Sequence, residues 1–173
     1  CLKNNTKYIY ASSGATYGAG ENGFDDDIEL IPKLKPLNKY GLSKQLFDKW
    51  VIDNNYHKKF VGLKYFNVFG PNENHKGDMR SMVNKAYGQI LETGKLRLFM
   101  SLRPEYKDGG QMRDFIYVKD AVEMTLFFDP FNESGKNETG IFNIGSGAAA
   151  TWLEAAGAVF AALGKKPEIE FID

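Results

Sequence analysis

The stretch KYIYASSGATYG, residues 7–18, is the part of the sequence that best indicates a fold. Its first half is a short run of aromatic and aliphatic residues, which is typical of a strand buried in a sheet. The run ends in Ser12 and Ser13, and a glycine-rich loop follows. Such serines are most often explained by turn formation, but in open α/β sheets ligands also bind beyond the carboxyl ends of the strands. The stretch therefore predicts a buried strand over 7–12 that ends in hydroxyl groups.

Strands and helices alternate along the rest of the chain, which predicts an α/β fold. The further expected strands cover residues 60–70, 95–100, 114–118, 140–147 and 168–172. The expected helices cover residues 39–55, 78–92, 120–128 and 148–163. Asn38 can cap the first of these helices and Asp78 the second.

The composition is that of an ordinary globular protein, with 43% hydrophobic and 25% charged residues. Lys plus Arg equals Asp plus Glu at 22 each, so the chain has no net basic field that would attract nucleic acid. A single cysteine fits a reducing compartment, and two histidines argue against a structural zinc site. No apolar run approaches the roughly 18 residues of a membrane span, and no signal-peptide pattern is present. We expect a cytoplasmic protein without a metal site, a membrane segment or a nucleic-acid partner.

The segment NKYGLSK, residues 38–44, places Tyr40 one helical turn before Lys44. On the expected helix the two residues share a stripe with Phe47 and Val51, which is unusual for a solvated lysine. An ammonium ion near a phenol favours the phenolate form, so Tyr40 is a candidate general acid/base. The alternative is a helix start whose polar side chains face water, and the pair alone does not decide between the two.

Five segments in a fixed order resemble the extended short-chain dehydrogenase/reductase family of sugar-nucleotide epimerases and dehydratases. They are YASSGATYG, YGLSK, KYFNVFGP, RDFIYVKD and GIFNIGSG. The resemblance implies part of a Rossmann-like doubly wound sheet, its C-terminal half, and part of a smaller α/β substrate-binding domain. We expect residues 1–70 to form the C-terminal half of the NAD(P)-binding domain with the catalytic residues. Residues 71–173 would mainly form the substrate-binding region, with 115–145 returning toward the Rossmann sheet.

The same resemblance implies that Ser13, Tyr40 and Lys44 are catalytic. Ser13 would hold the substrate oxygen, and Tyr40 would take the proton of the substrate hydroxyl as hydride leaves to the nicotinamide. Lys44 would bind the nicotinamide ribose and favour the phenolate of Tyr40. Tyr40 and Lys44 would thus also contact the cofactor.

Two further segments carry expected binding residues. Asn67 in FNVFGP corresponds to a substrate-contacting asparagine, and Val68 to a neighbour that lies against the cofactor. Arg113 in RDF corresponds to the cation that meets the nucleotide pyrophosphate, for which a planar guanidinium is well suited. The alternative for Arg113 is a surface arginine in a charged turn.

The segment NENHKGDM, residues 72–79, resembles the branch of the family that epimerises ADP-heptose at C6. That branch uses the lysine as a second base, which assigns this role to Lys76 and places Lys76 beside the cofactor. A second base fits the chemistry, because inverting a secondary alcohol through a ketone needs a proton handled on two sides. Dehydratases of the family carry an Asp-Glu pair after the serine, and Gly14 and Ala15 stand there. We expect NADP-dependent epimerisation of ADP-heptose through a transient 6-ketone, with NAD as the alternative cofactor.

Some features depart from that branch. Asp78 stands where the branch has a serine and Lys85 where it has a histidine, and we expect both to contact the substrate, ADP-heptose or a related nucleotide sugar. A UDP-hexose 4-epimerase and a non-catalytic nucleotide-sugar-binding relative remain alternatives. No G-x-x-G-x-x-G follows a first strand, so we expect the N-terminal cofactor-binding half of the fold to lie outside this chain. The resemblance also implies a homo-oligomer.

Overall fold

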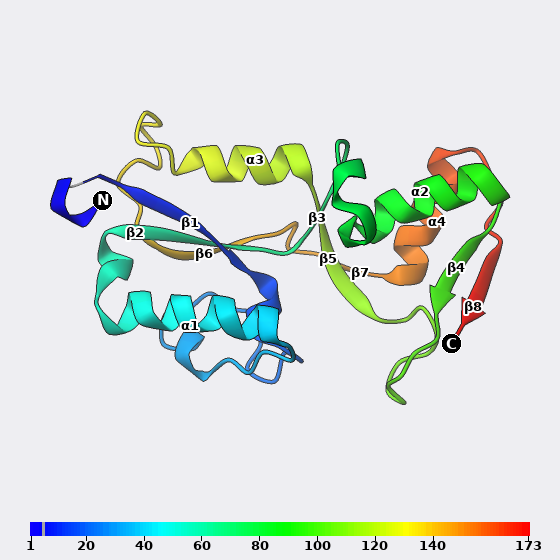
Figure 1. Cartoon of the computed structure of the whole chain (residues 1–173), viewed down its shortest axis with the longest axis horizontal. Helices are drawn as coiled ribbons and strands as arrows, with labels where there is room; N and C mark the ends of the chain where they lie inside the picture. Colours follow the sequence, from blue (N-terminus) through cyan, green and yellow to red (C-terminus); the bar gives the residue numbers. More distant parts are fainter. Residues whose placement is uncertain (5) are drawn as a thin grey trace. The chain divides into compact units, whose positions relative to one another are not determined.

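The computed structural model describes residues 1–4 and 6–173, which form two compact α/β units (Figure 1). Unit 1 comprises Cys1–Phe66 and Lys119–Gly145, and unit 2 comprises Asn67–Val118 and Ser146–Asp173. The α/β fold class is confirmed. The assignment of residues 1–70 and 71–173 to cofactor and substrate binding stays a prediction. Within the described residues, no helix combines the length and the apolar character that crossing a membrane requires.

Unit 1 is built on a parallel sheet with the strand order β1-β2-β6. Its strands are β1 (Tyr8–Ser13), β2 (Phe60–Tyr65) and β6 (Gly140–Ile144). Its helices are α1 (Lys39–Asp53), α3 (Val118–Phe127, whose first residue belongs to unit 2) and the 3-10 turns η1 (Leu2–Asn4), η2 (Gly14–Tyr17), η3 (Ile31–Lys33) and η4 (Tyr56–Lys58). The predicted strand at the start of the chain and the helix after Asn38 are confirmed to within two residues.

The two long helices of unit 1 cover opposite faces of this sheet (Figure 1). Consecutive side chains of a strand point to opposite faces. On β2, Lys64 contacts Asp48 of α1, whereas the next residue, Tyr65, bonds Thr125 of α3 through their hydroxyl groups at 2.6 Å. The sheet is therefore buried on both sides, as parallel sheets generally are.

Helix α1 begins as its sequence predicts, because the Asn38 side chain accepts a hydrogen bond from the Gly41 N–H at 2.8 Å. Its buried face differs from the expected stripe, and consists of Gly41, Gln45, Asp48 and Val51. A Cβ at Gly41 would lie 2.6 Å from the Ala15 carbonyl oxygen, so glycine lets α1 approach η2 closely. The polar residues Gln45 and Asp48 therefore lie inside the fold, and Tyr40 lies at its surface.

Unit 2 contains two small sheets, two α-helices and a 3-10 segment. A parallel pair joins β4 (Leu96–Phe99) to β8 (Ile169–Ile172), and a mixed sheet has the order β3 (Asn67–Phe69), β5 (Met112–Tyr117) and β7 (Ala149–Thr151). The helices are α2 (Met82–Thr93), α4 (Trp152–Ala162) and the 3-10 segment η5 (Asn74–Met79). The core lies between α2, α4 and the β4-β8 pair, and its buried side chains are Ala86, Ile90, Leu96, Leu98, Ala156, Val159 and Phe160.

Four expected boundaries are wrong. The strand predicted over 140–147 ends at Ile144, and the turn of the GSG segment follows it. The strand predicted over 60–70 divides into β2 and β3, which belong to different units. The helix predicted to start at Asp78 starts after Ser81, which caps α2 instead, because Arg80 and Ser81 have extended backbone conformations, with ψ of 153° and 156°. The helix predicted over 148–163 begins only at Trp152. There Thr151 and Glu154 form a capping box after the short strand β7.

The core of unit 2 can be tested at two neighbouring positions of α2. Ile90 is fully buried, whereas Leu91 on the same helix is 50% exposed. Replacing Ile90 with Ala should lower the free energy of unfolding by about 2–5 kcal/mol, because it leaves a cavity, and Leu91→Ala should cost less than about 1 kcal/mol. Urea denaturation of the full-length protein measures both values, and equal losses would contradict this packing.

Candidate functional site

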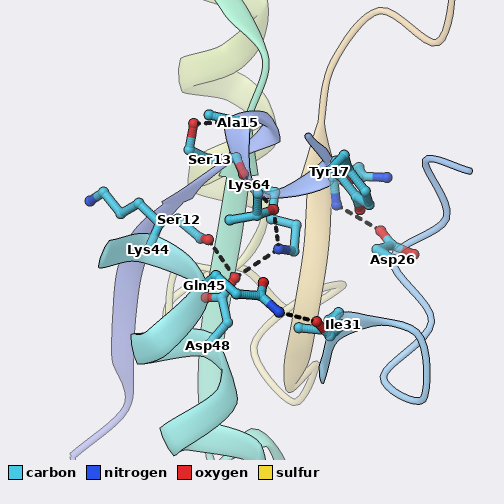
Figure 2. A network of polar contacts seen from close by, with 12 residues as sticks. Ser12, Ser13, Ala15, Tyr17, Asp26, Ile31, Lys44, Gln45, Asp48 and Lys64 are labelled. Atoms are coloured by element: carbon cyan, nitrogen blue, oxygen red, sulfur yellow. Dashed lines mark hydrogen bonds and ion pairs between the residues drawn. The ribbon is translucent and has the colours of Figure 1, made fainter. Parts of the chain in front are cut away.

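Ser13 ends β1 and caps the short helix η2 (Figure 2). Its Oγ accepts a hydrogen bond from the Ala15 N–H at 3.1 Å, and its carbonyl oxygen accepts one from the Thr16 hydroxyl at 2.9 Å. Two contacts from the following turn thus fix Ser13 at the carboxyl end of a parallel strand. The hydroxyl hydrogen of Ser13 is not used in either contact, so it can be donated to a ligand.

Tyr40 and Lys44 lie close together on α1, as their spacing predicts. The Lys44 Nζ lies 5.9 Å from the centroid of the Tyr40 ring, and it donates a hydrogen bond to the Ala11 carbonyl oxygen at 2.8 Å. This contact brings Lys44 to β1, two residues before Ser13. Tyr40 is 57% exposed. In the part of the chain that the structure describes, no hydrogen bond joins the side chains of Ser13, Tyr40 and Lys44 to one another.

An open hollow of about 540 Å³ lies between β1 and α1. Its lining residues are Tyr8, Ile9, Tyr10, Ala11, Ser12, Ser43, Lys44 and Phe47. Lys44 makes no ion pair with any described residue, and its bond to Ala11 leaves two ammonium hydrogens available for a ligand such as a ribose. The donor chemistry of Lys44 therefore fits the predicted contact with a nicotinamide nucleotide.

Behind Ser13 lies a buried polar cluster that sequence analysis missed (Figure 2). Its centre is an ion pair between Asp48 of α1 and Lys64 of β2, with 2.7 Å between the Asp48 Oδ2 and the Lys64 Nζ and no exposed surface on either side chain. Burial lowers the pKa of Lys64, and the Asp48 carboxylate opposes this shift. Lys64 itself could have indicated this cluster in the sequence, because a charged residue in the buried run FVGLKY requires a buried partner.

In unit 2, the mixed sheet brings two predicted binding residues together. Asn67 on β3 donates its side-chain amide to the carbonyl oxygen of Asp114 on β5 at 3.1 Å, and Asp114 directly follows Arg113. The carboxylate of Asp114 accepts hydrogen bonds from the Ser146 N–H and hydroxyl and from the Gly147 N–H, at 2.8, 2.8 and 2.9 Å. Asp114 thereby fixes the turn of the GSG segment against the strand that carries Arg113. Val68, next to Asn67, is half-buried.

The loop that carries Lys76 is closed by a second carboxylate that sequence analysis did not single out. Glu73 is buried and accepts hydrogen bonds from the Gly70 N–H at 3.1 Å, and from the Ser81 N–H and hydroxyl at 2.7 Å each. Lys76 is exposed, and its Nζ lies 3.7 Å from Glu73. Burial would raise the pKa of Glu73, but the hydrogen bonds from Ser81 and Gly70 and the charge of Lys76 outweigh it and lower that pKa.

The two remaining predicted residues are exposed. Asp78 lies in η5, two residues after Lys76, and Lys85 lies on α2. Neither side chain forms a hydrogen bond or an ion pair with any residue that the structure describes. The predicted set therefore divides between the units, with Ser13, Tyr40 and Lys44 in unit 1 and the other six residues in unit 2.

The lowered pKa of Glu73 predicts an acid-dependent loss of stability. A carboxylate whose pKa falls below its ordinary value of 4.5 stabilises the fold above that value and ceases to do so as the pH falls through the lowered pKa. Glu73→Gln should cost about 1–3 kcal/mol at neutral pH and should make stability less sensitive to pH below 4.5. Denaturation between pH 7 and pH 3 tests this, with Glu92→Gln, on the exposed face of α2, as the control. Parallel pH profiles for wild type and Glu73→Gln would contradict the assignment.

Comparison with known proteins gives a consistent picture. Residues 1–145 match the NAD dependent epimerase/dehydratase family. The chain is 52% identical over its whole length to an ADP-L-glycero-D-manno-heptose-6-epimerase of Nitratidesulfovibrio vulgaris, of which it covers 52%. It is 50% identical over 157 residues to the protein of the same name from Fusobacterium nucleatum, covering 89% of this chain and 46% of that protein. The chain thus spans about half the length of the curated relatives that it matches.

Solved structures resemble the chain as well. The ADP-L-glycero-D-manno-heptose-6-epimerase of Helicobacter pylori matches with a TM-score of 0.74 and 28% identity, over 98% of this chain and 49% of that one. The UDP-glucose 4-epimerase of Thermus thermophilus, solved with NAD, matches with a TM-score of 0.70 and 31% identity, over 95% of this chain and 50% of that one. Given the match of residues 1–145 and the similarity to these relatives, the chain belongs to the NAD dependent epimerase/dehydratase family.

Proposed function

We propose that the protein converts ADP-D-glycero-D-manno-heptose to ADP-L-glycero-D-manno-heptose by epimerisation at C6, with NADP as cofactor and NAD as the alternative. The observation that carries the proposal is the 52% identity over all 173 residues to a relative named as this epimerase. The proposal includes a cytoplasmic location, a role in lipopolysaccharide precursor synthesis and a homo-oligomeric state, as the family resemblance implies.

Tyr40 is the proposed acid/base group on one side of the C6 oxygen. The residue is 57% exposed, and the Lys44 ammonium lies 5.9 Å from the ring centroid. Ser13 retains a hydroxyl hydrogen that it can donate to the same substrate oxygen, because its Oγ already accepts from Ala15. Tyr40 removes the proton of the C6 hydroxyl while Ser13 orients it.

Lys76 is the proposed second acid/base group. A transient 6-ketone that is reduced from its other face presents its oxygen in a new direction, so a proton must be supplied from a second side. Lys76 is exposed, so it can reach a ligand, and its Nζ lies 3.7 Å from Glu73. The bonds of Glu73 to Gly70 and Ser81 hold the loop that carries this lysine.

The nicotinamide cofactor, when bound, accepts hydride from C6 and returns it. Tyr40, Lys44, Val68 and Lys76 are the residues of this chain that we propose to hold it. Lys44 offers ammonium hydrogens to ribose hydroxyls, and the half-buried Val68 offers an apolar surface.

The nucleotide sugar would be held mainly by unit 2. Arg113 suits the pyrophosphate because a guanidinium can bind phosphate oxygens in a bidentate manner. The amide nitrogen of Asn67 is held by Asp114, which leaves its amide oxygen to accept from a sugar hydroxyl. Asp78 and Lys85 are proposed to contact the sugar hydroxyls and the nucleotide.

Replacing Lys76 with Ala separates the proposed reaction from that of a UDP-hexose 4-epimerase. Loss of the second acid/base group should lower kcat by about 100- to 10,000-fold, whereas an enzyme with one such group would remain active. Lys166→Ala, an exposed lysine in unit 2, should retain wild-type kcat and serves as the matched control. Full activity of Lys76→Ala with ADP-heptose would exclude the two-base mechanism.

Tyr40→Phe tests the first acid/base group. Removing only the hydroxyl should lower kcat by about 100- to 10,000-fold while the KM for the nucleotide sugar changes little, because Tyr40 acts on the reacting oxygen. The control is Tyr87→Phe, an exposed tyrosine on α2, which should behave as wild type. A wild-type kcat in Tyr40→Phe would show that Tyr40 is not the acid/base group.

The overall function is tested by incubating the full-length protein with NADP and ADP-D-glycero-D-manno-heptose and following the C6 proton by NMR. We expect conversion to a mixture of the two epimers. Tight binding of the nucleotide sugar without conversion would instead support the non-catalytic alternative. Conversion of UDP-glucose but not of ADP-heptose would support the 4-epimerase.

A further inference from the structure

We propose that Asp48, Lys64 and Thr16 are positioning residues that hold Ser13 at a fixed place relative to Tyr40 and Lys44. The inference rests on the proposed function, in which Ser13, Tyr40 and Lys44 are the reacting groups of unit 1. Asp48, Lys64 and Thr16 have no exposed surface. They therefore act through the residues that they contact and do not touch a ligand themselves.

The first part of this arrangement joins α1 to β1. The Asp48 Oδ1 accepts a hydrogen bond from the Tyr10 hydroxyl at 3.0 Å, and its Oδ2 accepts one from the Ser12 hydroxyl at 2.6 Å. Tyr10 and Ser12 point to the same face of β1 because they are two residues apart. Asp48 follows Lys44 by one helical turn and Tyr40 by two. The carboxylate of Asp48 thus fixes the position of α1, which carries Tyr40 and Lys44, along β1, which ends in Ser13.

The second part joins β2 to the backbone of Ser13. Lys64 donates to the Thr16 Oγ1 at 2.7 Å, and the Thr16 hydroxyl donates to the Ser13 carbonyl oxygen at 2.9 Å. The directions are consistent, because an ammonium group can only donate and a hydroxyl can accept one bond while donating another. The Lys64 Nζ also lies 5.2 Å from the centroid of the Tyr17 ring in the same turn. Lys64 therefore links the carboxylate of Asp48, on α1, to the turn η2, which Ser13 caps (Figure 2).

The chemistry of the cluster favours positioning over simple stabilisation. Burying two charges costs desolvation free energy, and an apolar pair of the same size often serves stability as well. An apolar pair, however, has no directional bonds that could hold a carbonyl oxygen and two strand side chains at set distances. Besides bonding each other, Asp48 and Lys64 form hydrogen bonds with the hydroxyl groups of Tyr10, Ser12 and Thr16. The arrangement therefore specifies geometry at Ser13, where the proposed chemistry needs it.

The test uses Thr16→Val and Thr16→Ser in the full-length protein with NADP and ADP-heptose. Thr16→Val keeps the shape of the side chain, removes the link from Lys64 to Ser13, and leaves the bonds of Asp48 to β1 intact. We expect kcat to fall about 10- to 100-fold, because a small displacement of a reacting group costs that much, while KM stays within about threefold. Thr16→Ser restores the hydroxyl and should return kcat to within about threefold of wild type.

The control for a general loss of stability is Val51→Ala. Val51 is fully buried on the same helix, in an apolar cluster with Tyr10 and Phe60. This variant should lose stability and keep the wild-type kcat at a temperature where it is folded. An equal loss of kcat in Val51→Ala and Thr16→Val, or no rescue by Thr16→Ser, would overturn the inference.

A second variant covers the case in which Thr16→Val does not fold. The double variant with Asp48→Asn and Lys64→Met removes both buried charges together, which avoids leaving one of them unpaired. It should fold and show the same loss of kcat, and a wild-type kcat would overturn the inference.

The proposed function and this inference fail in different ways. Wild-type protein that converts no ADP-heptose overturns the function. In that case crystal structures of the wild type and of Thr16→Val decide the positioning role. Displacement of Ser13 relative to Lys44 in the variant supports it, and an unchanged arrangement overturns it.

Discussion

The buried ion pair between Asp48 and Lys64 is the interaction on which the candidate site in unit 1 depends. It joins the helix that carries Tyr40 and Lys44 to two strands of the parallel sheet, and it does so at the carboxyl end where ligands bind in α/β folds. Because both charges are fully buried, neither can be lost alone without leaving the other unpaired. Asp48 and Lys64 are therefore expected to tolerate substitution only when both are replaced together.

Carboxylates perform a similar task in unit 2. Glu73 closes the loop of Lys76 by accepting from Gly70 and Ser81, and Asp114 holds the Ser146–Gly147 turn beside Arg113. In each case one carboxylate accepts several hydrogen bonds from a loop or turn and so fixes the backbone of that segment. Exposed residues with proposed roles in catalysis or binding thus lie next to acidic residues that fix the backbone around them.

The sequence predicted much of this arrangement where local rules apply. The strand before Ser13, the cap at Asn38 and the helical spacing of Tyr40 and Lys44 follow from patterns of a few residues, and the structure confirms them. The helix start at Ser81 was missed, because it depends on the extended backbone of Arg80 and Ser81 and on the acceptor Glu73, which bonds the Ser81 N–H from eight residues away. The Asp48–Lys64 pair was missed for the same reason, since 16 residues separate its members and only the packing of α1 on the sheet brings them together.

In the proposed reaction, Tyr40 and Lys76 serve one substrate oxygen from two sides. The most direct test is a crystal structure of the full-length protein with its nicotinamide cofactor and ADP-heptose bound. We predict the Tyr40 Oη and the Lys76 Nζ on opposite sides of C6, each within hydrogen-bond reach, about 3 Å, of the position that the C6 oxygen takes in one of the two epimers. A Lys76 side chain that points into solvent, away from the bound heptose, would contradict the account.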